Sequence, residues 1–122
     1  MGKRILIVDD DPVIRVLIEE FLQSHGYDVS VVESGETCLS QLEKELPDLL
    51  FLDLQMPTMT GIEVLKNMRN NPKTVNVPVV MLSANDERST LKTAFDTGAP
   101  RFLQKPFAMN DILNAIESCE LV

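Results

Sequence analysis

The sequence lacks the motifs of several protein classes. Its two cysteines, Cys38 and Cys119, stand far apart and form no CxxC pair, which argues against a zinc site or a dithiol redox site. No apolar run approaches the roughly 20 residues that a membrane-spanning helix needs. The apolar segment near the start runs straight into aspartates, unlike a signal peptide. We therefore expect a cytoplasmic protein with no membrane partner.

Positive charge is also scarce. Acidic residues outnumber basic ones 19 to 11, and the formal net charge is −8. Non-specific nucleic-acid binding draws its affinity from neutralising phosphates, so we expect no direct nucleic-acid partner. An acidic site that binds a divalent cation is compatible with this charge. The length of 122 residues, 44 % of them hydrophobic, predicts one domain over residues 1–122.

Short apolar runs alternate with segments of helical period. Strands are predicted at 5–8, 29–32, 49–52, 77–82 and, more weakly, 101–103. The first, third and fourth runs are almost continuously apolar, which is typical of strands covered on both faces of a parallel sheet.

Five apolar stripes between and after these runs predict five helices. Asp11-Pro12 would start the first helix and His25-Gly26 would end it. Ser34 would cap the second helix and Pro47 would close it, Thr60 begins a capping-box spacing for the third, and Gly98 would end the fourth. The stripes are Ile14, Leu17, Ile18, Phe21 and Leu22; Cys38, Leu39, Leu42 and Leu46; Ile62, Leu65 and Met68; Leu91, Ala94 and Phe95; and Ile112, Leu113, Ile116 and Cys119. With right-handed crossovers, this order predicts a doubly wound α/β fold.

Polar residues follow four of the five predicted strands. Asp9 and Asp10 follow the first, Asp53 the third, Ser83 the fourth, and Lys105 comes shortly after the fifth. Ligands of such sheets bind beyond the carboxyl ends of the strands, so these side chains should meet at one edge.

Three carboxylates at one edge repel each other unless a cation compensates them. Magnesium prefers oxygen ligands, which Asp9, Asp10, Asp53 and a backbone carbonyl near Gln55 could supply. Lys105 would suit a phosphoryl group, and the Ser83 hydroxyl could donate a hydrogen bond to it. A carboxylate is a competent nucleophile toward phosphorus, and Asp53 is central in the predicted sheet.

In four segments the chain resembles the receiver domains of bacterial two-component response regulators, of the single-domain kind that chemotaxis regulators represent. The matching segments are residues 5–12, Asp53-Leu54-Gln55-Met56-Pro57 with Gly61, residues 79–84, and Lys105-Pro106-Phe107. The resemblance implies a flavodoxin-like five-stranded parallel sheet in the order 2-1-3-4-5 with five helices.

The resemblance also implies roles. Asp53 would be the phosphoacceptor, Asp9 and Asp10 the pair that holds Mg²⁺ (or Mn²⁺), and Lys105 the charge partner. The same resemblance makes Ser83 and Phe102 the switch residues, and Gln55 and Asn85 would tune dephosphorylation. A histidine kinase or histidine phosphotransfer protein would supply the phosphoryl group. The surface of the fourth helix, fifth strand and fifth helix would then change for a downstream protein. The chain would be a monomer or a phosphorylation-dependent dimer.

Other interpretations stay open at this point. The chain could be a receiver excised from a longer regulator with an output domain, or a scaffold that is never phosphorylated. A phosphatase of the haloacid-dehalogenase type would need an acid where Gln55 stands. A flavodoxin would need a glycine- and hydroxyl-rich loop where this chain has three consecutive aspartates. Phe102 could simply pack on an edge strand.

Overall fold

The computed structural model describes residues 3–84, 88–99 and 101–120. Strands and helices alternate along the chain, as predicted. The strands are β1 (Arg4–Val8), β2 (Asp28–Val32), β3 (Leu49–Asp53), β4 (Val79–Ser83) and β5 (Arg101–Gln104). The helices are α1 (Pro12–Ser24), α2 (Gly35–Lys44), α3 (Gly61–Arg69), α4 (Arg88–Thr97) and α5 (Met109–Glu120).

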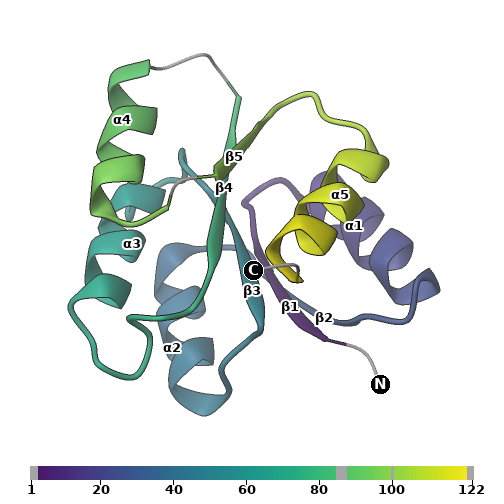
Figure 1. Ribbon diagram of the computed structural model, residues 1–122, viewed down its shortest axis with the longest axis horizontal. Coiled ribbons are helices and arrows are strands. Elements are labelled where there is room, and N and C mark those ends of the chain that lie inside the picture. Colours follow the sequence, from purple (N-terminus) through teal and green to yellow (C-terminus); the bar gives the residue numbers. More distant parts are fainter. Residues whose placement is uncertain (1–2, 85–87, 100, 121–122) are drawn as a thin grey trace.

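The five strands form one parallel sheet in the order β2-β1-β3-β4-β5. Helices α2, α3 and α4 lie on one face of the sheet, and α1 and α5 lie on the other (Figure 1). This arrangement confirms the predicted flavodoxin-like α/β fold and places β1 and β3 side by side at its centre.

Strand β3 shows why its sequence is so apolar. Every residue of β3 is buried, and alternate side chains enter different cores. Leu50 and Leu52 belong to the core beneath α2, α3 and α4, whereas Phe51 belongs to the core beneath α1 and α5. A strand with helices on both faces has no solvated side, so only its last residue, Asp53, can be polar and still reach a site.

The helix termini follow from local capping. The Asp11 side chain accepts a hydrogen bond from the Val13 amide at 2.9 Å, with proline next in the chain. Ser34 and Thr60 form capping boxes at the starts of α2 and α3. Gly26 and Gly98, which follow α1 and α4, adopt φ values of +88° and +120°, a region that glycine enters without strain.

Three residues of the apolar stripes that predicted the helices are exposed in the structure. Leu17 (48 % exposed) lies beside Val13 and Val16 on the solvent side of α1, which packs through the neighbouring Ile18. Phe95 (61 %) follows the buried Ala94, and one residue turns a helix by about 100°. Leu46 (44 %) lies beyond α2, which ends at Lys44 rather than near Pro47.

All five strands differ from their predicted ranges by one or two residues at one or both ends. Val77 is buried but precedes β4, because its amide donates to the carbonyl of Thr74 in a turn. Strand β4 therefore runs from Val79 to Ser83, and β5 continues to Gln104. Within the described residues, no helix combines the length and apolarity needed to cross a membrane.

Candidate functional site

Asp9 is a buried carboxylate directly after β1. Its Oδ1 accepts a hydrogen bond from the Asp11 amide at 2.9 Å. Its Oδ2 has no hydrogen bond of good geometry among the described residues, and its close neighbour is the Lys105 ammonium at 2.7 Å. Asp10, the next residue, is exposed. One acid of the pair is therefore fixed inside the site while the other lies at its solvent side.

Asp53 ends the central strand β3 and is 3 % exposed. Its Oδ1 accepts a hydrogen bond from the backbone N–H of Gln55 at 3.2 Å. The neighbouring Leu54 amide donates to the Leu82 carbonyl at 2.9 Å, which continues the pairing with β4 beyond the strand end. Asp53 is thereby held at the carboxyl edge of the sheet by the chain that follows it.

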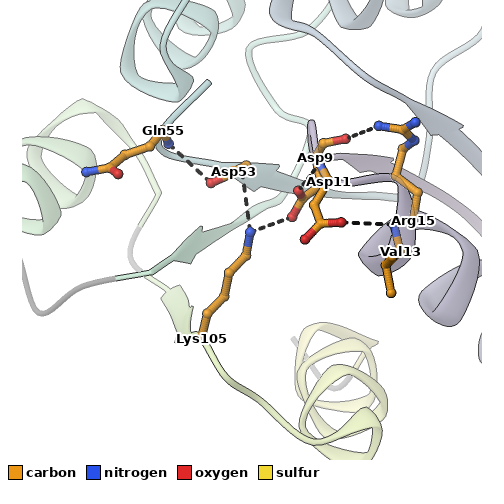
Figure 2. Close-up of polar contacts among 7 residues, drawn as sticks. All are labelled: Asp9, Asp11, Val13, Arg15, Asp53, Gln55 and Lys105. Carbon is orange, nitrogen blue, oxygen red and sulfur yellow. Dashed lines mark hydrogen bonds and ion pairs between the residues drawn. The ribbon is translucent and has the colours of Figure 1, made fainter. Parts of the chain in front are cut away.

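Lys105 reaches the same edge of the sheet from the residues that follow the outermost strand, β5. Its backbone amide donates to the Ser83 carbonyl at 2.6 Å, and its bond to Pro106 is cis. Its ammonium lies 2.7 Å from Asp9 Oδ2 and 3.4 Å from Asp53 Oδ2 (Figure 2). One cation therefore bridges two buried carboxylates from different strands.

Burial and neighbouring charges change the pKa values of Asp53 and Lys105. Burial raises the pKa of Asp53 to about 6, and the charge of Asp9 contributes to this rise, while Lys105 and the Gln55 amide act in the opposite direction. Burial alone would lower the pKa of Lys105, but its contacts with Asp9 and Asp53 outweigh this effect and raise it. Burial therefore sets the direction of the change at Asp53, and the neighbouring charges at Asp9 and Lys105 modify it.

The geometry of the acids suits a divalent cation. Asp9, Asp10 and Asp53 each offer one oxygen, and these three oxygens lie within 4.8 Å of one another. Carboxylate oxygens are ligands that Mg²⁺ takes readily in proteins. The residues present therefore fit the metal. The fourth ligand expected near Gln55, a backbone carbonyl, stays a prediction.

Two further predicted residues, Ser83 and Phe102, lie on β4 and β5. Ser83 is buried at the end of β4, and its neighbour Leu82 pairs with Asp53 across the sheet. Phe102 lies on the edge strand β5 and is 48 % exposed. The switch roles of Ser83 and Phe102 stay predictions. Asn85 lies outside the described residues.

Arg15 belongs to the site's surroundings but was missed from the sequence. It lies in the first turns of α1 and donates from Nη1 to the backbone carbonyl of Asp9 at 2.8 Å. Its only sequence signal is a single basic residue among the apolar side chains of the first helix, a position that is equally typical of a solvated charge.

Comparison with known proteins gives consistent relatives. The family model of the response regulator receiver domain matches residues 5–117. The alkaline phosphatase synthesis transcriptional regulatory protein PhoP of Bacillus subtilis (strain 168) is 38 % identical over 112 residues, which cover 92 % of this chain and 46 % of PhoP. The chain spans about half the length of the curated relatives it matches.

Solved structures show the same fold. The chemotaxis response regulator CheY4 of Vibrio cholerae superposes with a TM-score of 0.91 at 28 % identity, covering 98 % of this chain and 99 % of that one. The receiver domain of the sensor histidine kinase PA1611 from Pseudomonas aeruginosa PAO1 gives a TM-score of 0.87 at 27 % identity, covering 97 % of both chains. That domain was crystallised with a magnesium ion coordinated in its active-site cleft.

Proposed function

Because the chain belongs to the response regulator receiver domain family, we propose that it is a phosphorylation-dependent signalling switch whose phosphoacceptor is Asp53. The family is a signalling phosphoacceptor domain and not a classical enzyme. The observation that carries the proposal is the convergence of Asp9, Asp10, Asp53 and Lys105 on one edge of the sheet. We take residues 1–122 as one receiver domain.

The transfer needs an ionised carboxylate and little other covalent machinery. A carboxylate oxygen of Asp53 attacks the phosphorus of a phosphohistidine, and the new O–P bond forms as the P–N bond breaks. The electron pair of the broken bond stays on the imidazole nitrogen, which then takes up a proton. With a pKa of about 6, Asp53 is largely ionised at neutral pH even before any cation binds. Lys105 lies where it can attract an oxygen of the arriving phosphoryl group.

Asp9, Asp10 and Asp53 would hold Mg²⁺, with Mn²⁺ as an alternative and the Gln55 backbone carbonyl as a further ligand. Once bound, the ion would supply positive charge that offsets the three carboxylates and the phosphoryl oxygens. The magnesium ion in the PA1611 receiver domain supports this choice of metal. The clustering of the three carboxylates supports a cation site from this chain itself.

The switch would work by a shift in population between two arrangements. Ser83, at the buried end of β4, would donate a hydrogen bond to a phosphoryl oxygen, and Phe102 would turn inward from its half-exposed position on β5. The surface formed by α4, β5 and α5 would then change for an unidentified downstream protein. Gln55 and Asn85 would set the lifetime of the phosphorylated state.

The partners proposed are a histidine kinase or a histidine phosphotransfer protein, met in the cytoplasm. The net charge of −8 disfavours direct contact with nucleic acid by this domain. Because the chain spans only part of its curated relatives, a longer regulator with an output domain is a second form of the same proposal. The domain itself would be a monomer or a phosphorylation-dependent dimer. A scaffold that is never phosphorylated is the competing function.

Intact-mass spectrometry after incubation with acetyl phosphate tests the proposal. We expect a mass gain of one phosphoryl group that requires Mg²⁺ and is lost in Asp53→Asn. Asp48→Asn is the matched control, because Asp48 is an exposed acid just before the opposite end of the same strand. A gain that survives in Asp53→Asn would place the phosphoacceptor at another residue and contradict the proposal. No gain at all in a folded protein that binds Mg²⁺ would favour the scaffold.

A further inference from the structure

A guanidinium outside the acidic cluster holds the loop that carries two of the acids. Arg15 Nη1 donates a hydrogen bond to the backbone carbonyl oxygen of Asp9 at 2.8 Å. Figure 2 shows the Arg15 side chain reaching back from α1 to the residue that follows β1, on the side of Asp9 away from Lys105. The proposed transfer makes no use of this residue.

With Arg15 in place, each polar part of Asp9 has a contact. Its amide donates to the Val32 carbonyl on β2 at 3.2 Å, and its Oδ1 accepts from the Asp11 amide. Its Oδ2 faces the Lys105 ammonium, and its carbonyl oxygen accepts from Arg15. Of these four contacts, the one from Arg15 holds the carbonyl side of the peptide that leads into Asp10.

Asp10 depends on that peptide for its position. It is exposed, and its neighbour Asp11 is fixed as the cap of α1 through the Val13 amide. The two residues that flank Asp10 are therefore anchored, Asp9 partly by Arg15 and Asp11 by the helix. Arg15 is itself well placed for this task, because its own amide donates to the Asp11 carbonyl at 3.1 Å within the first turn.

We infer that Arg15 is a positioning residue for the divalent-cation site. Its hydrogen bond to the Asp9 carbonyl fixes the loop between β1 and α1, so that the oxygens of Asp9 and Asp10 face the cation together. The inference deepens the proposed function and rests on the cation site proposed there.

The guanidinium of Arg15 has two opposing effects on the affinity of the site for a divalent cation. Its positive charge repels a bound cation, so removal of the charge alone would strengthen metal binding. Loss of the hydrogen bond would loosen the loop and weaken metal binding. Groups that orient a metal ligand typically contribute about 10- to 100-fold in affinity. We expect the loss of positioning to prevail.

Calorimetric titration of the intact chain with Mg²⁺ alone measures the sign of the effect. Arg15→Met and Arg15→Gln, two neutral replacements, are expected to raise the dissociation constant roughly tenfold, the lower end of the range for groups that orient a ligand. Arg15→Lys keeps a cationic donor and should recover most of the affinity. Lys44→Met removes an exposed cation from the end of α2 and should leave the dissociation constant unchanged. Urea unfolding in EDTA establishes that each variant is folded before it is titrated.

Binding by either folded neutral variant that is as tight as in the wild type, or tighter, would overturn the inference. That result would show that the hydrogen bond from Arg15 does not position the cation ligands. It leaves the proposed function intact, since the wild type still binds Mg²⁺. A wild type that fails to bind Mg²⁺ would instead remove the proposed cation site, and the role of Arg15 with it.

Discussion

Replacement of Asp53 by asparagine is expected to stabilise the metal-free protein at neutral pH. The folded protein raises the pKa of Asp53 from 3.8 to about 6, chiefly through burial and then through the charge of Asp9. Ionisation of Asp53 is therefore less favourable in the folded than in the unfolded chain. A rise of this size corresponds to a penalty of about 3 kcal/mol on ionised Asp53. A neutral asparagine side chain would avoid this penalty, while its oxygen could still accept the hydrogen bond from the Gln55 amide.

The sign of the pH dependence follows from the raised pKa. Below its unfolded pKa, Asp53 is protonated in both states and imposes no penalty. Between about pH 4 and pH 6 the unfolded chain releases the proton while the folded chain retains it, so the free energy of unfolding falls as pH rises. The penalty is complete once the pH exceeds the folded pKa of about 6. The advantage of Asp53→Asn should therefore be small in acid and grow toward neutral pH.

Urea unfolding in EDTA, followed by circular dichroism, measures this difference. Wild type, Asp53→Asn and the control Asp48→Asn are compared at about pH 4, 5.5 and 7.5, where common titrations of other groups cancel between variants. Added Mg²⁺ should reduce the advantage of Asp53→Asn, because ligand binding stabilises the folded wild type. An advantage that is absent at neutral pH, or equal at all three pH values, would refute the assignment of the penalty to Asp53.

Three further substitutions, each followed by urea unfolding, probe the site and the loops of the fold. Lys105→Met leaves the buried Asp9 and Asp53 without their shared cation. It should lower the free energy of unfolding by about 3–5 kcal/mol at neutral pH, with partial recovery in Mg²⁺. Full stability in EDTA would show that the ion pairs contribute nothing. Gly61→Ala would place a Cβ against the Asp53 carbonyl and 2.9 Å from Leu54 Cα. It should therefore destabilise the protein by about 1–3 kcal/mol and slow phosphorylation by acetyl phosphate. An unchanged rate would mean that the chain after β3 adjusts without moving Asp53. Arg69→Met removes hydrogen bonds to the carbonyls of Gly98, Thr74 and Val75. It should lower the free energy of unfolding by about 2 kcal/mol, and Lys66→Met, which changes an exposed lysine, is the control. Equal stability of the two variants would indicate that water replaces the guanidinium.

The sequence was sufficient for the fold because its local and long-range signals agree. Capping residues such as Ser34 and Thr60 mark the helix starts, and the apolar runs mark strands with two covered faces. The periodicity was less informative about the width of each buried helix face. Leu17 and Phe95 fit a helical stripe but lie beyond the part of the helix that contacts the sheet. Only packing against a neighbour defines that limit.

The candidate site was predictable for a geometric reason. Parallel strands end at one edge of a sheet, so Asp9, Asp53 and Lys105 could be placed together although they are far apart in the chain. The contact from Arg15 to the Asp9 carbonyl was not predictable, because a long side chain has many rotamers and its acceptor is a backbone atom. The raised pKa of Asp53 was equally hidden, since it depends on the extent of burial.

Chemical trapping of the acyl phosphate tests the central claim most directly. The protein is incubated with acetyl phosphate and Mg²⁺ and reduced with borohydride, which converts a phosphorylated aspartate to homoserine. Peptide mass spectrometry then locates the modified residue. The account predicts homoserine at position 53 alone, and none when Mg²⁺ is withheld. Homoserine at Asp9, Asp10 or any other acid, with Asp53 unmodified, would contradict it.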